Sequence, residues 1–332
     1  MKIIKITLLI LLIIILFLLG YFFIGDPKPL ENIIWGVNFS QKYTQNLGLD
    51  WRETYLALLD DLGAKKLKIA AHWNLIQPEI NKFYFDDLDW QINEVENRGG
   101  KILLVIGMKT PRWPECHIPE WAKGFSKKEQ QEEILNMLET IVLRYKDSKA
   151  IWGWQVENEP FFSFGECPWV DNEFLKKEIS LVKSLDFAKR PIVISESGEF
   201  PLWISAAQYG DMVGVTMYKK VWFHQIGVYI TYPFSPAFYY RKADIVRNFF
   251  GKEVICVELQ TEPWTEAFIT NTSLEEQKKT MNLIQFKENI EFAKKTGIGE
   301  FYLWGGEWMY WMKEKQDRPE IWNEAKKLFI RN

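Results

Sequence analysis

Short apolar segments alternate with longer amphipathic segments along most of this chain. Runs rich in β-branched and aromatic residues predict eight strands, at 33–37, 66–71, 101–107, 150–156, 190–195, 212–216, 253–257 and 300–304. Apolar residues at helical spacing predict helices between or after them, at 51–62, 88–98, 127–145, 172–185, 243–250, 274–295 and 320–330. Eight such alternations in about 300 residues predict an α/β fold with a single (β/α)8 TIM barrel. The alternative is a doubly wound open sheet, which the lack of Gly-x-Gly-x-x-Gly after the first strand disfavours.

The N-terminal residues do not follow this alternation. An uncharged apolar run extends from Ile6 to Ile24, preceded by Lys2 and Lys5. As a helix it would cover about 28 Å, close to the ~30 Å of a bilayer's hydrocarbon core. We therefore predict a cytoplasmic stub with one transmembrane signal anchor at 1–25, a linker at 26–31 and the barrel at 32–332. A cleaved signal peptide is the alternative.

Charge near the membrane sets the expected orientation. The two N-terminal lysines indicate that the short N-terminal end stays in the cytoplasm and the barrel lies outside it. The net charge of −3 is mixed along the chain, without the basic stripe that nucleic acid requires. We expect a monomer that contacts the membrane through its N-terminal helix, with a carbohydrate as its other partner.

The cysteines and histidines show no metal-ligand spacing. Cys116 and Cys167 fall in loops after predicted strands, whereas Cys256 lies inside a predicted strand. Thiols outside the membrane tend to pair, so a Cys116–Cys167 disulfide is one expectation and three free thiols the other. No Cys-x-x-Cys is present, and His72, His117 and His224 are scattered. The pattern implies neither a metal nor a cofactor.

Two predicted strands stop at carboxylates. The fourth leads into Glu157-Asn158-Glu159-Pro160, and Glu258 closes the seventh. The C-terminal ends of barrel strands line the active site. Glycosidic-bond cleavage needs one protonated carboxyl, which donates a proton to the leaving oxygen, and one ionised carboxylate, which attacks the anomeric carbon. The two strand ends can supply this pair.

Asn-Glu-Pro after a Trp-rich fourth strand, with Glu closing the seventh, resembles the clan A glycoside hydrolases, and families 5 and 42 are the most similar. These are retaining (β/α)8 enzymes. The resemblance implies that Glu159 is the acid/base, that Glu258 is the nucleophile and that Asn158 binds the sugar 2-hydroxyl.

Other strands resemble the same clan. Tyr218, after the sixth strand, is implied to hydrogen-bond the nucleophile, and Trp304, in the eighth, to form the floor of the cleavage subsite. The first and second strands and the loop after the seventh supply further candidate substrate contacts, namely Asn38, Lys68, His72, Trp73 and Trp264.

The chain departs from family 5 at two places. Lys68 stands where that family usually has Arg, and Lys lacks the planar fork that holds a carboxylate bidentately. Residues 108–113 stand where a His is usual, so Lys109 or Arg112 could face the substrate.

Several positions have more than one interpretation. Glu157 could be the acid if the strand register slips, and Glu196 and Glu199 are expected to be solvated loop carboxylates. The aromatic segment 218–240 is expected to be a long loop that either forms a wall of the cleft or packs its own aromatics.

Together these features predict a retaining glycoside hydrolase acting on an extracytoplasmic poly- or oligosaccharide by double displacement. A transglycosylase that remodels surface polysaccharide and a non-catalytic carbohydrate-binding barrel are the alternatives.

Overall fold

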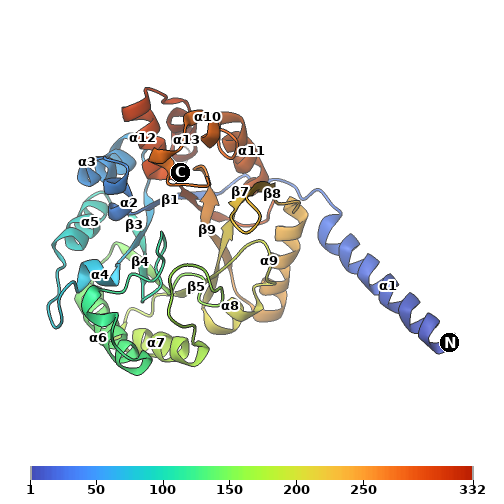
Figure 1. The fold of residues 1–332 in the computed structure, drawn as a ribbon, viewed down its shortest axis with the longest axis horizontal. Coiled ribbons are helices and arrows are strands. Elements are labelled where there is room, and N and C mark those ends of the chain that lie inside the picture. The colour runs from blue at the N-terminus through green and yellow to red at the C-terminus, as the bar shows by residue number, and fades with distance from the viewer. Residues whose placement is uncertain (1, 331–332) are drawn as a thin grey trace.

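A closed barrel of eight parallel strands forms the centre of the molecule (Figure 1). The computed structural model describes residues 2–330. The strands follow one another around the barrel in the order β1-β10-β9-β6-β5-β4-β3-β2. Their bounds are β1 Ile34–Phe39, β2 Lys66–Ala70, β3 Lys101–Ile106, β4 Ile151–Val156, β5 Ile192–Glu196, β6 Met212–Met217, β9 Val254–Gln260 and β10 Glu300–Trp304. The predicted fold and all eight strand positions are confirmed.

Helices surround the barrel on its outside (Figure 1). The longer ones are α5 Asp86–Asn97, α6 Lys127–Tyr145, α7 Asn172–Leu185, α9 Pro236–Phe250, α11 Leu283–Lys294, α12 Gly306–Gln316 and α13 Glu320–Phe329. Shorter ones are α2 Gln41–Asn46, α3 Trp51–Leu56 (continued by a π-helical turn, Ala57–Asp61), α4 Trp73–Ile76, α8 Ile204–Tyr209 and α10 Leu274–Gln277. Two 3-10 turns lie at Glu120–Ala122 and Ile269–Asn271.

Two predicted helices had the wrong bounds, and the long helix α12 was not predicted. The helix expected at 274–295 is broken, because Asn282 caps a second helix by accepting from the Gln285 backbone N–H. The helix expected at 243–250 begins at Pro236, a residue suited to a first helical turn. The missed helix α12 is buried on all sides from Gly306 to Met312, so it lacks amphipathic periodicity.

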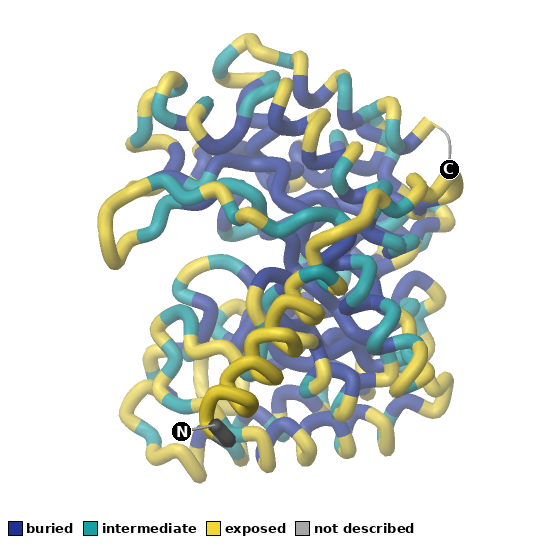
Figure 2. The backbone as a smooth tube through the Cα atoms, turned by 90° about the vertical axis from the view of Figure 1, so that its right-hand side faces the viewer, coloured by how far each residue is buried: buried dark blue, intermediate teal, exposed yellow. Residues whose placement is uncertain are grey.

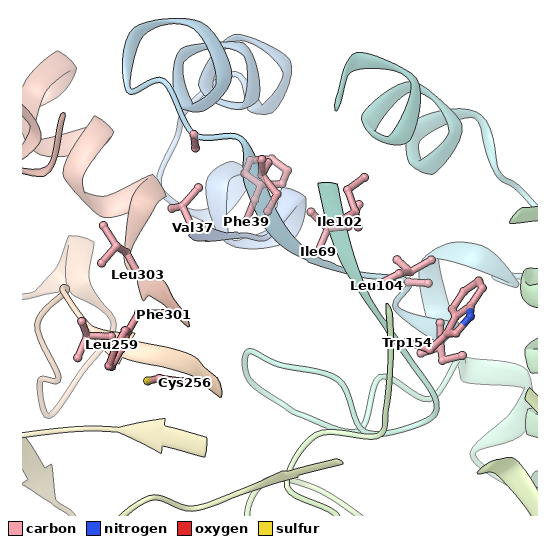
Figure 3. Packing of buried hydrophobic residues seen from close by; sticks show 14 of the residues in the cluster. Val37, Phe39, Ile69, Ile102, Leu104, Trp154, Cys256, Leu259, Phe301 and Leu303 are labelled. Carbon is pink, nitrogen blue, oxygen red and sulfur yellow. The ribbon is translucent and has the colours of Figure 1, made fainter. Parts of the chain in front are cut away.

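Apolar residues fill two layers. The larger lies between the strands and the helices, where Val37, Ile69, Leu104, Trp154 and Phe301 pack (Figure 3). The smaller lies inside the barrel and contains Leu103, Val193, Ile255, Val257 and Tyr302. Most of these inner residues belong to the N-terminal halves of their strands. Apolar packing therefore closes this end of the barrel interior and leaves the C-terminal end for polar side chains.

The aromatic segment after β6 is partly ordered as a hairpin. Strands β7 Lys220–Phe223 and β8 Val228–Thr231 pair antiparallel. Ring contacts join Trp222 to Tyr229 and Tyr232 to Phe234. The segment therefore packs its own aromatics, as one of the two interpretations expected, although it is not the simple loop that was predicted.

The helix α1, Lys2–Phe23, extends away from the barrel beside α9 (Figures 1 and 2). Its stretch Ile4–Phe23 is apolar and long enough to cross a bilayer, and it fits a signal sequence or a single membrane anchor. Its last turn packs on α9, with the Phe23 and Phe238 ring centroids 5.3 Å apart. The following residues are held at the end of α11, where the Leu30 N–H donates to the Lys294 carbonyl at 2.8 Å.

Candidate active site

The acid candidate Glu159 lies just after β4, where the backbone turns sharply. Glu157 and Glu159 both have left-handed φ angles, of 61° and 43°, which non-glycine residues rarely adopt. The neighbouring strands hold this turn. The Glu159 N–H donates to Ser195 Oγ at 2.8 Å, and Thr216 Oγ1 donates to Glu159 Oε1 at 3.2 Å.

The surroundings of Glu159 favour its protonated form. Burial raises the pKa of Glu159 to about 8, and the charges of Glu258 and Glu115 add to this effect, while Lys109 opposes it. A carboxyl that keeps its proton at neutral pH can donate it to a leaving oxygen.

The nucleophile candidate Glu258 lies in β9 and is held by two donors. Lys68 Nζ, from β2, lies 2.8 Å from Glu258 Oε1, and Tyr218 Oη donates to Glu258 Oε2 at 2.7 Å. Asn38 on β1 donates to the Val257 carbonyl at 3.0 Å and thereby joins β1 to the same strand. The two donors stabilise a negative charge on Glu258 and fix the orientation of its carboxylate.

A third carboxyl, Glu115, belongs to this group and was not expected from the sequence. Asn158 Nδ2 donates to Glu115 Oε2 at 3.0 Å. Burial raises the pKa of Glu115 to about 8; Lys109 opposes this shift and Glu258 adds to it. The only sequence signal was its position beside Cys116, which is joined to Cys167 by a disulfide with a Cα–Cα distance of 5.1 Å.

Arg112 lies between two aromatic rings at the candidate floor of the site. Its guanidinium carbon is 3.6 Å from the Tyr43 ring centroid and 3.8 Å from that of Trp304. It also forms ion pairs with Glu262 and Glu307. Burial alone would lower the pKa of the Arg112 guanidinium, but the charges of Glu262 and Glu307 outweigh this effect and raise it. One face of Trp304 is therefore covered, and its role as a sugar platform stays a prediction.

Most of the other predicted contacts lie around one pocket. Asn38, Lys68, His72 and Trp304 are among the residues that line it. Trp73 is not among them; it is completely buried, and its indole N–H donates to Gln77 at 2.9 Å. Trp264 instead packs edge-on against Tyr218, with ring centroids 5.0 Å apart.

His72 is a buried, neutral residue of the pocket wall. It packs on His117 with ring centroids 4.0 Å apart, and its Nδ1 lies 2.7 Å from Thr110 Oγ1. Burial, aided by the neighbouring His117, lowers the pKa of His72 well below its usual value. Among residues 2–330, no group of three or more His, Cys, Asp and Glu side chains is arranged to hold a metal ion.

The alternative acid Glu157 faces a neighbouring strand end. Its two carboxyl oxygens accept from the backbone N–H groups of Met108 and Lys109, at 2.8 and 2.6 Å. Burial raises the pKa of both Glu157 and the adjacent Glu178. This buried hydrogen bonding is a structural role and favours Glu159 as the acid.

The expectation that Glu196 and Glu199 are solvated was wrong. Both are buried, at 6% and 4% exposure. The Ala206 N–H donates to Glu196 Oε2 at 3.3 Å, and the Tyr218 N–H donates to Glu199 Oε1 at 2.8 Å. The chain after β5 and β6 folds over these carboxyls and replaces water with backbone donors. Glu199 thereby fixes the backbone of Tyr218, which binds the candidate nucleophile.

The solved structures that are similar to this chain are glycoside hydrolases, and the similarity shows a shared barrel fold. A GH5_18 structure from Bifidobacterium longum subsp. longum, in complex with Manb1-4GlcNAc, has a TM-score of 0.59 at 12% identity and covers 82% of this chain and 68% of its own. An endo-β-1,4-xylanase of glycoside hydrolase family 10 from Gloeophyllum trabeum has a TM-score of 0.56 at 15% identity. The aligned part covers 82% of this chain and 84% of the xylanase chain.

A curated relative found by sequence similarity is also a glycoside hydrolase. The β-galactosidase Bga of Halorubrum lacusprofundi is 27% identical over 128 residues, which cover 33% of this chain and only 18% of the relative. No protein-family model matches the chain. The predicted resemblance to clan A barrels is confirmed at the level of the fold.

Proposed function

We propose that this protein is a retaining glycoside hydrolase in which Glu159 is the acid/base and Glu258 the nucleophile. The observation that carries the proposal is the contrast between the two carboxyls. Glu258 accepts from Lys68 and Tyr218, which stabilise its charged form. Glu159 is buried among like charges, which favour its protonated form. Retaining hydrolysis requires this division of roles.

The reaction would proceed in two steps. Glu159 gives its proton to the glycosidic oxygen while Glu258 attacks the anomeric carbon, so the bond to the leaving sugar breaks and a covalent glycosyl-enzyme forms. Glu159, now a carboxylate, takes a proton from water as the water oxygen attacks the same carbon. The bond to Glu258 breaks, and both carboxyls return to their starting forms with the anomeric configuration retained.

Two substitutions and a rescue test this assignment. We expect Glu159→Ala and Glu258→Ala each to abolish turnover in a screen of aryl glycosides, and azide to restore turnover to Glu258→Ala with an inverted glycosyl azide as product. Glu253→Ala is a matched control, because Glu253 directly precedes β9 and its side chain is 70% exposed. Full activity in either active-site variant, or glycan binding by a wild-type protein inert on every substrate, would overturn the proposal.

The proposed setting is the outer face of a membrane, with an extracytoplasmic poly- or oligosaccharide as substrate. A disulfide persists in oxidising compartments outside the cytoplasm, and the apolar α1 has the length of a single-pass anchor. Anchoring predicts that the intact N-terminus stays in the membrane fraction after an alkaline wash. A soluble protein with a shortened N-terminus would show instead that α1 is a cleaved signal.

A further inference from the structure

A series of aromatic rings leads from the catalytic site to the molecular surface. Tyr218, which binds Glu258, packs on Trp264 with ring centroids 5.0 Å apart. Trp264 lies 6.4 Å from Phe164 by the same measure, and Phe164 lies 6.1 Å from Trp113. Phe162 is parallel to Phe164 at 5.9 Å. The outermost rings are open to solvent, since Trp113 is 61% exposed and Phe162 47% exposed.

The loops that carry these rings are fastened to each other. The loop after β3 carries Trp113, and the loop after β4 carries Phe162 and Phe164. The Cys116–Cys167 disulfide joins the two, and the Glu166 N–H donates to the Pro114 carbonyl at 2.9 Å. A Cβ at Gly165 would lie 2.6 Å from that same carbonyl oxygen, so only glycine allows so close an approach. The backbones of the two loops that carry the rings are therefore joined before any ligand binds.

We propose that Trp113, Phe162, Phe164 and Trp264 form a binding track for further sugar units of a glycan chain, leading outward from the scissile bond. The track rests on the proposed function and deepens it, because it makes a chain, rather than a single sugar, the substrate. Pyranose rings have apolar faces that pack on flat aromatic rings. The track begins at Trp264, which packs on Tyr218, the residue that touches the candidate nucleophile.

Two other exposed phenylalanines lack these features. Phe187 and Phe249 are each 81% exposed, yet neither makes a ring contact within residues 2–330. Single exposed apolar residues are normal on protein surfaces, whereas contiguous ones mark binding sites. Continuity with Tyr218 distinguishes the track from these two residues. Phe187 and Phe249 therefore serve as matched controls for the test.

The test compares long and short substrates of one sugar. The probes are cellohexaose, xylohexaose and mannohexaose, each beside the p-nitrophenyl β-glycoside of its monosaccharide. For the sugar that is cleaved, Trp113→Ala should lower kcat/KM on the hexasaccharide by about tenfold, the loss of one stacked ring. Activity on the aryl monosaccharide should stay within about twofold, which also shows that the variant folds. Phe187→Ala should change neither.

Two outcomes would overturn the track. One is an equal effect of Trp113→Ala on the long and short substrates. The other applies to a wild-type protein that cleaves none of these probes, in which case the proposed function is judged by the full screen of aryl glycosides and the track by binding alone. Hexasaccharide binding measured by calorimetry and lost in Trp113→Ala would then still support it, whereas no binding of any hexasaccharide would contradict it.

Discussion

Lys68 Nζ lies 2.8 Å from Glu258 Oε1, and the two side chains are only 1% and 5% exposed. This ion pair crosses the barrel interior from β2 to β9. The single ammonium group of Lys68 can replace the bidentate guanidinium of an arginine here, because Tyr218 binds the other carboxylate oxygen of Glu258. The carboxylate is therefore held by two side chains from different strands.

Removing the lysine leaves a buried carboxylate without its counter-charge. We expect Lys68→Met to destabilise the protein by roughly 3–5 kcal/mol and to reduce turnover strongly. Urea unfolding and kcat on an aryl glycoside measure the two effects. Lys66→Met is the control, because Lys66 lies in the same strand and forms an ion pair with Glu300. This pair is more exposed, since the side chains of Lys66 and Glu300 are 22% and 11% exposed. An equal loss of activity in both variants would contradict a specific role for Lys68.

Tyr218 offers a test that separates orientation from stability. Tyr218→Phe keeps the ring against Trp264 and removes only the donor to Glu258. The loss of a hydrogen bond to a charged group, about 1.5–3 kcal/mol, corresponds to a fall in kcat/KM of roughly 10- to 100-fold. We expect the unfolding midpoint to change little by comparison. Unchanged kinetics would show that this hydroxyl does not act on the nucleophile.

The dependence of kcat/KM on pH should report the protonation of Glu159. Glu159 must be protonated to donate, and its pKa is raised to about 8, so we expect kcat/KM to fall as pH rises through about 8. The charge of Glu115 is one cause of this raised pKa. Glu115, whose own pKa is raised to about 8, gains this charge over the same pH range. Glu115→Gln prevents that charge from forming, so the alkaline limb should move to lower pH.

A profile of kcat/KM against pH for both proteins checks this shift. Glu266→Gln, which removes an exposed carboxylate in the loop after β9, should leave the limb in place. A shift of the limb to higher pH in Glu115→Gln would contradict the assignment, because loss of a like charge can only favour ionisation of Glu159.

The sequence predicted the positions of the candidate residues that lie in a regular strand or directly after one. Glu159 lies just after β4 and Glu258 lies within β9, and the order of the strands places both carboxyls at the same end of the barrel. Glu115 was beyond reach, because it lies in a loop where its backbone has a left-handed φ angle of 71°. Arg112, in the same loop with a φ of 81°, was named only as one of two residues that could face the substrate. Glu199 was misjudged for a related reason, since its burial depends on how the chain after β6 folds back.

The disulfide connects stability to substrate length. Cys116 and Cys167 are 51 residues apart in sequence, and a loop of that size corresponds to about 4 kcal/mol of chain entropy. We expect Cys116→Ser/Cys167→Ser to lose roughly 2–4 kcal/mol in urea unfolding and to become insensitive to dithiothreitol, while the wild type weakens on reduction. Because the bond fastens the Trp113 loop to the Phe164 loop, activity on a hexasaccharide should fall more than activity on the aryl monosaccharide. Equal losses on the two substrates would show that the bond stabilises the barrel without ordering the aromatic track.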